Sequence, residues 1–165
     1  MIRLAQGYAG EGQWGPPLLL LFACCALVAV GGALAWTDAR TRLLPDRLVV
    51  RLGLGVVPTL AVAALWSGEP ERLVRALACG AAAGALFFCV HWLSPRSLGF
   101  GDVKLVPVLG FACGFLSWGH PVFAAVLACL MGGVWAAVLL AAGRRAAHVP
   151  LGPGLVLGCV LALAM

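Results

Sequence analysis

The sequence is poor in charged residues: only 10% of its 165 residues are Asp, Glu, Lys or Arg. A soluble domain carries about 25%, so this composition excludes an ordinary water-soluble fold. Hydrophobic residues make up 63% of the chain, and the mean hydropathy is +1.05. These values predict one membrane-embedded domain that covers residues 1–165.

A strip of basic residues is also missing. The net charge is +5, but Lys and Arg stand beside the predicted helix ends rather than along one face with exposed aromatic residues. That pattern is not typical of a nucleic-acid-binding protein. We therefore expect no nucleic-acid partner.

Two metal-binding patterns are absent as well. None of the seven cysteines forms a CxxC pair, and none of the three histidines lies in an HExxH motif. Structural zinc needs paired ligands at short spacing, and zinc peptidases use HExxH. We expect no metal and no cofactor, and we interpret the cysteines as small hydrophobic side chains.

Long apolar segments are what the chain does contain. A spanning helix needs about 20 mostly apolar residues, and the pattern predicts an all-α, polytopic integral membrane protein with about six transmembrane helices. The fourth segment is short, so we expect it to take residues from the loop before it. The six predicted segments are Leu18–Trp36, Leu48–Trp66, Leu73–Leu93, Leu105–Trp118, Pro121–Ala142 and Pro150–Met165. Small residues predicted at helix contacts are Gly80, Gly84, Gly132 and Gly133.

The loops predict the orientation. Eight basic residues fall beside the odd-numbered loops and three on the other side. Short basic loops remain in the cytoplasm, so both termini are expected outside. The first group comprises Arg40, Arg42, Arg47, Arg51, Arg96, Lys104, Arg144 and Arg145, and the second comprises Arg3, Arg72 and Arg75.

Two aspartates fall on the basic side, next to apolar segments. Asp38 follows the first segment, and Asp102 precedes the fourth in the stretch RSLGFGDVKL. Two predicted crossings separate them, so they share a side of the membrane in either orientation. A carboxylate is costly at that depth, which makes the pair a candidate functional site.

Two close carboxylates cannot both ionise easily and share a proton. One can then act as a general base on water and the other as a general acid on a carbonyl, which favours peptide-bond hydrolysis. Gly99 and Gly101 would permit positive φ and a close approach of the substrate. A purely structural alternative stays open, because Asp102 also fits a helix N-cap and Asp38 could balance neighbouring arginines.

These residues carry a family resemblance. The segment DARTRLLPD (38–46), the later GFGDVKL (99–105) and the closing HVPLGPGLVLG (148–158) resemble the type IV prepilin peptidases. The resemblance implies an intramembrane aspartic endopeptidase with Asp38 and Asp102 as its catalytic pair. It also implies loop-forming roles for Gly99 and Gly101, and matches Lys104, Pro45 and Asp46 to motif positions, the last two with a structural role.

The resemblance further implies the substrate and the place of action. Substrates would be pilin-like precursors with a short basic leader ending in glycine, cut at the cytoplasmic face of the cell membrane. The basic residues on that face would contact anionic lipid. Larger relatives carry an N-terminal methylating domain; with about 17 residues before the first segment, we expect none here.

Two other functions remain open from the sequence. A lipoprotein signal peptidase-like protease also uses two aspartates, although its Asn-containing motifs are not visible. A small non-enzymatic transporter or assembly scaffold is the alternative from another class, although broken helices with midplane charges are not evident. Loss of either aspartate would abolish an enzyme but be tolerated by a scaffold.

Overall fold

The computed structural model describes residues 1, 6, 8, 14–41, 45–93, 99–141 and 152–164. Within these ranges the chain forms α-helices and no strand, which confirms the predicted all-α fold. The helices are α2 (Gly15–Thr41), α3 (Asp46–Trp66), α4 (Pro70–Leu93), α5 (Phe100–Leu116), α6 (Gly119–Ala141) and α7 (Gly152–Ala164).

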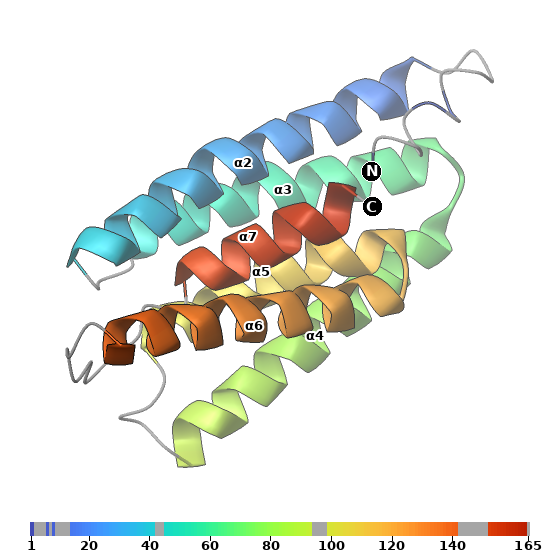
Figure 1. Ribbon diagram of the computed structural model, residues 1–165. Helices are drawn as coiled ribbons and strands as arrows, with labels where there is room; N and C mark the ends of the chain where they lie inside the picture. Colours follow the sequence, from blue (N-terminus) through green and yellow to red (C-terminus); the bar gives the residue numbers. More distant parts are fainter. Residues whose placement is uncertain are drawn as a thin grey trace.

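Helix α5 occupies the centre of the bundle. It packs against α3, α4, α6 and α7, whereas α2 packs against α3 and α7. Figure 1 shows α2 and α3 side by side, α7 between them and α6, and α4 diverging from the rest towards its C-terminal end. Eleven of the 17 residues of α5 are buried, as expected for a helix that is apolar on all sides.

The outer helices turn apolar side chains away from the protein. Three helical stretches are long and apolar enough to cross a membrane, and only 17–33% of the best window in each is buried inside the protein. Their exposed faces carry large side chains such as Leu54 and Trp92, which suits lipid rather than water. The chain is therefore a membrane protein. The three stretches are Gly15–Asp38, Asp46–Trp66 and Pro70–Leu93.

The number of crossings stays a prediction. Helix α5 has 17 residues, and the apolar stretches found in α6 and α7, Gly119–Trp135 and Gly152–Ala164, are shorter than the three long ones. Six helices are thus seen in the described residues, and six crossings remain our expectation.

Small residues bring α4 and α5 together. A Cβ atom on Gly80 would lie 2.8 Å from the Pro107 carbonyl oxygen, and one on Gly84 would lie 2.8 Å from Pro107 Cγ. The predicted role of these two glycines in helix contact is confirmed. The same role is wrong for Gly133, where a Cβ would meet nothing within 4 Å.

Arg75 joins α4 to the C-terminal end of α5. Its guanidinium donates hydrogen bonds to the carbonyl oxygens of Gly114 at 2.8 Å, Phe115 at 2.8 Å and Leu116 at 2.9 Å. The last carbonyls of a helix have no partner within the helix, and an arginine is well suited to bind them. The sequence assigned Arg75 only to membrane orientation, so this structural role is an addition.

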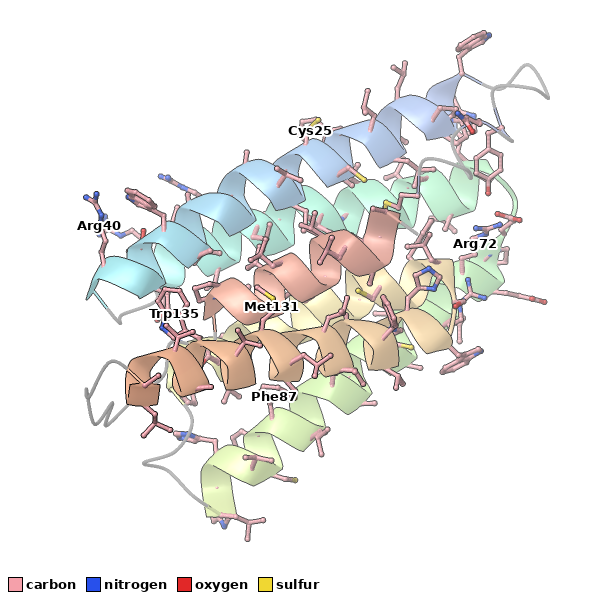
Figure 2. The ribbon with its side chains drawn as sticks, viewed as in Figure 1. Cys25, Arg40, Arg72, Phe87, Met131 and Trp135 are labelled. Carbon is pink, nitrogen blue, oxygen red and sulfur yellow. The ribbon has the colours of Figure 1, made fainter. Side chains whose placement is uncertain are left out.

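The two ends of the bundle carry different charged residues. The C-terminal end of α2 and the N-terminal ends of α3, α5 and α7 lie together, opposite the α3–α4 turn (Figure 1). Figure 2 shows Arg40 at the first end and Arg72 at the other. Their separation agrees with the predicted two sides. Five of the basic residues assigned to a side from the sequence lie outside the described residues: Arg3, Arg42, Arg96, Arg144 and Arg145.

Candidate functional site

Asp38 is the last buried residue along one face of α2. Buried residues recur along this helix at Leu20, Ala23, Leu27, Gly31, Leu34 and Asp38, at the three- and four-residue spacing of one helical face. The Asp38 side chain is only 5% exposed. The helix continues to Thr41, so the expectation that Asp38 follows the first helix is corrected: it lies inside the last turns of α2.

Asp102 lies in the first turn of α5 and is 7% exposed. The helix begins at Phe100 rather than Leu105, because the Asp102 N–H already donates to the Gly99 carbonyl at 3.1 Å. This confirms that the fourth helix takes residues from the preceding loop. It also places Asp102 within the helix rather than before it, and the structure records no side-chain cap at this helix start.

The glycines of the GFGD segment do not adopt the predicted conformation. Gly99 has φ −66° and ψ 137°, which is extended backbone open to any residue, and Gly101 is helical. The expected positive φ is therefore wrong for both, and Gly101 does not form a loop. Among the described glycines only Gly68, in the α3–α4 turn, has positive φ, at 69°.

Asp38 and Asp102 come from helices far apart in the sequence, yet both are buried where the C-terminal end of α2 and the N-terminal end of α5 share one end of the bundle. One Asp38 oxygen, Oδ2, accepts a hydrogen bond of 3.1 Å from the Gly152 N–H at the start of α7. Asp102 Oδ1 is buried and has no hydrogen-bond partner among the described residues. Helix α7 packs against both α2 and α5, and its first residue contacts Asp38 of α2.

Lys104 and Asp46 form an ion pair at the edge of this site. The Lys104 ammonium donates to Asp46 Oδ2 at 2.7 Å and lies 4.9 Å from the centre of the Phe100 ring. Lys104 is partly exposed, whereas Asp102 two residues earlier is buried, as expected for positions on different faces of a helix. The pair ties the start of α5 to the start of α3.

Pro45 and Asp46 open α3. Pro45 is the N-cap with φ −70° and ψ 120°, and its carbonyl accepts the Leu48 N–H at 2.9 Å. Asp46 follows in the first turn, where an acidic side chain suits the positive end of the helix dipole. The structural role expected for this Pro-Asp pair stays a prediction.

The sequence did not single out Gly152 as a site residue. The signal that could have found it is the Pro-Leu-Gly-Pro-Gly run at 150–154 before the last apolar segment, which is typical of a helix start. The parts of the closing segment at 148–151 lie outside the described residues. What the run could not reveal is that this helix start faces Asp38.

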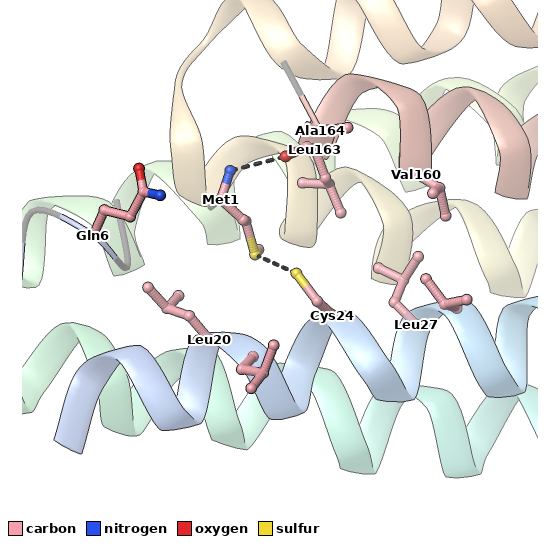
Figure 3. Close-up of a pocket in the computed structure, with 10 residues that line it drawn as sticks. Met1, Gln6, Leu20, Cys24, Leu27, Val160, Leu163 and Ala164 are labelled. Carbon is pink, nitrogen blue, oxygen red and sulfur yellow. Dashed lines mark hydrogen bonds between the residues drawn. The ribbon is translucent and has the colours of Figure 1, made fainter. Parts of the chain in front are cut away.

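Two apolar cavities lie away from the carboxylates. Figure 3 shows one of about 440 Å³ between α2, α7 and the chain start, where the Met1 ammonium donates to the Leu163 carbonyl at 2.8 Å. The other, of about 460 Å³, lies among α4, α5, α6 and α7 and reaches the thiols of Cys113 and Cys159, which are 3.4 Å apart. Neither is lined by Asp38 or Asp102.

The cysteines are free thiols that differ in exposure. Cys79, Cys113 and Cys159 are buried, whereas Cys25, Cys89 and Cys129 are exposed. Within the described ranges no group of three or more His, Cys, Asp or Glu side chains could hold a metal ion. The expected absence of a metal and a cofactor stays a prediction.

Comparisons with known proteins point to one family. The sequence profile of the type IV leader peptidase family matches residues 17–137, a range that contains both aspartates. The chain is 33% identical over 147 residues to a prepilin leader peptidase/N-methyltransferase of Bacillus subtilis, covering 87% of this chain and 56% of the relative. It is 34% identical over 139 residues to a prepilin leader peptidase/N-methyltransferase of Xanthomonas campestris pv. campestris, covering 78% and 43%.

The chain spans about half the length of these curated relatives. No solved structure matches it. The family match favours neither a lipoprotein signal peptidase nor a transporter or scaffold, the two alternatives that the sequence left open.

Proposed function

Because the chain belongs to the type IV leader peptidase family, we propose that it is an intramembrane aspartic endopeptidase with Asp38 and Asp102 as its catalytic residues. One observation carries the proposal: two carboxyl groups from distant helices are both buried, and the helix ends that hold them share one end of the bundle. Buried carboxylates are rare unless they serve a function. Asp46, in contrast, is exposed and paired with Lys104.

The reaction follows from one proton shared by two carboxyl groups. The ionised aspartate takes a proton from water, and the resulting hydroxide adds to the scissile carbonyl carbon. The protonated aspartate gives its proton to the carbonyl oxygen, which forms a gem-diol. The amide nitrogen then takes the proton that came from water, and the C–N bond breaks. A gem-diol hydroxyl returns its proton to the second aspartate, which restores the starting state.

The proposed substrates are type IV pilin-like precursors, which carry a short basic leader before a long apolar helix. Cleavage after the glycine at that junction requires catalytic groups near one membrane surface. Asp38 and Asp102 would be these groups, at the end of the bundle where α2 ends and α5 begins. The excess of basic residues predicted for this end favours its location in the cytoplasm. We propose a multi-pass protein of the cytoplasmic membrane, with its active site facing the cytoplasm, both termini outside and its basic loops against anionic lipid.

The test is cleavage by the purified chain in lipid nanodiscs. A pilin-like precursor should lose its leader after the glycine, and in H₂¹⁸O the new leader carboxyl should gain one ¹⁸O atom. A lipoprotein precursor with a lipid-modified cysteine is the matched control and should remain intact. Binding of the pilin-like precursor without cleavage would support a scaffold and overturn the proposal.

A further inference from the structure

The two aspartates have different surroundings, and the difference concerns hydrogen-bond donors. Asp38 Oδ2 accepts the buried N–H of Gly152 at 3.1 Å. Gly152 is the first residue of α7, a helix of 13 residues, and the first N–H groups of a helix have no partner within the helix. These free donors and the helix dipole favour a negative charge beside them. Asp38 therefore lies in surroundings that suit the ionised carboxylate.

Asp102 Oδ1 has no equivalent donor among the described residues. This oxygen is buried, and two like charges in one site disfavour ionisation of the second group. An ionised carboxylate buried without a donor is unfavourable. A protonated Asp102 avoids this cost and also has an O–H to donate.

Gly152 also determines how closely α7 approaches Asp38. A Cβ on this residue would lie 2.5 Å from Asp38 Oδ2 and 3.0 Å from its Cγ, so any side chain here would displace the Asp38 carboxyl group. Gly154, two residues later, faces α6 instead, where a Cβ would lie 3.1 Å from the Ala128 carbonyl oxygen. The two glycines of one short segment thus contact different helices.

We infer that Gly152 is a positioning residue that holds Asp38 as the ionised member of the pair and leaves the shared proton on Asp102. This inference rests on the proposed function, and it makes Asp38 the general base and Asp102 the general acid. Exchange of these roles would place the negative charge on Asp102, whose buried Oδ1 has no donor in the described part of the chain.

Other charged groups near Asp38 do not reverse this assignment. The described residues of α7 carry no charged side chain. On α3, Arg47 and Arg51 are exposed and Asp46 pairs with Lys104 of α5. Arg40, on α2 itself, lies 4.3 Å over the Trp36 ring at the surface.

Two reagents distinguish the carboxyl groups by protonation. A carboxylate oxygen opens an epoxide, and the resulting alkoxide takes a proton from water. A diazoacetyl compound instead takes the proton of a carboxylic acid, loses N₂ and forms an ester with the remaining carboxylate. With the full chain in nanodiscs at neutral pH, mass spectrometry should find the epoxide ester on Asp38 and the diazo-derived ester on Asp102. Epoxide on Asp102, or equally on both aspartates, would overturn the assignment.

Exchange of the Gly152 amide for an ester, by incorporation of glycolate, removes the N–H without adding a Cβ. It should slow epoxide labelling of Asp38 by about tenfold, the effect of one lost hydrogen bond to a charged group. The same exchange at Gly154 is the control and should leave labelling unchanged. Equal effects at both positions would show a general loss of helix structure and overturn the role of Gly152. Labelling needs no substrate, so loss of the proposed peptidase function alone would leave this result intact.

Discussion

Lys104 Nζ lies 2.7 Å from Asp46 Oδ2 and connects the first turns of α5 and α3 beside the buried aspartates. Both side chains reach solvent, with exposed fractions of 39% and 65%. An exposed pair of this kind contributes at most about 1 kcal/mol. The contact can align the two helix starts, but it does not place Asp46 in the chemistry.

Asp46→Asn is therefore expected to retain most of the peptidase activity. A double-mutant cycle with Lys104→Met, followed by unfolding in detergent, should give a coupling energy of at most about 1 kcal/mol. Complete loss of cleavage by Asp46→Asn, with the protein level unchanged, would contradict a structural role.

Asp38→Asn and Asp102→Asn should each abolish precursor cleavage while leaving membrane insertion intact. Each change removes one of the two groups that move protons, and residues that act as a unit do not add their effects. The double variant should therefore be no slower than either single variant. Rates are measured by mass spectrometry of the released leader, and substantial turnover by either single variant would exclude the proposed pair.

Topology gives a prediction that needs no substrate. In a cysteine-free background, a cysteine at position 40 should react with an impermeant thiol reagent only from the cytoplasmic side. A cysteine at position 69, in the α3–α4 turn, should react only from outside. The opposite result would invert the orientation predicted from the basic residues. Reaction of both positions from the same side would contradict the separation of bundle ends seen in Figure 1.

Gly80→Ala should destabilise the protein by about 1–3 kcal/mol, the usual cost of overpacking. Its new methyl group would lie 2.8 Å from the Pro107 backbone oxygen, which cannot move without displacing α5. Gly133→Ala is the matched control, since nothing lies within 4 Å of its added Cβ, and it should change stability by no more than about 0.5 kcal/mol. Thermal unfolding in nanodiscs measures both, and equal values would refute close α4–α5 packing at Gly80.

Cleavage without methylation is expected from these 165 residues. Peptide hydrolysis needs two carboxyl groups and a water molecule, whereas methyl transfer needs a pocket with polar groups for an S-adenosyl cofactor. The two apolar cavities described above offer few polar groups, and a polar pocket of about 520 Å³, lined by Glu69, Glu71, Arg72 and Arg75, lies at the α3–α4 turn, at the other end of the bundle from the two aspartates. The product formed with and without S-adenosylmethionine should have the same mass. A cofactor-dependent gain of one methyl group would reveal a site for the second activity.

Local periodicity made part of this structure predictable. The apolar segments predicted where the helices lie. Because two of these segments separate Asp38 from Asp102, they also predicted that the two aspartates lie at the same end of the bundle. Burial of Asp38 also follows from the spacing of Leu27, Leu34 and Asp38 on one helical face. These features depend on residues close together in the chain, or on a count of crossings.

Tertiary contacts were not predictable in this way. The Gly152–Asp38 hydrogen bond joins residues 114 positions apart, and no local pattern in either segment indicates the other. The GFGD motif suggested a turn with positive φ, but α5 begins early enough to include Gly101 and Asp102. A glycine motif shows where the backbone is free, and the neighbouring helices determine which conformation it adopts.

The bonds from Arg75 to the end of α5 have a consequence for biosynthesis. An arginine that enters the membrane within α4 alone is costly, and its acceptors, the carbonyls of Gly114, Phe115 and Leu116, are synthesised only later. Helix α5 in turn ends in carbonyl oxygens that have no partner within the helix and that accept hydrogen bonds from Arg75. Each helix lowers the insertion cost of the other, so α4 and α5 should leave the translocon together, as a hairpin.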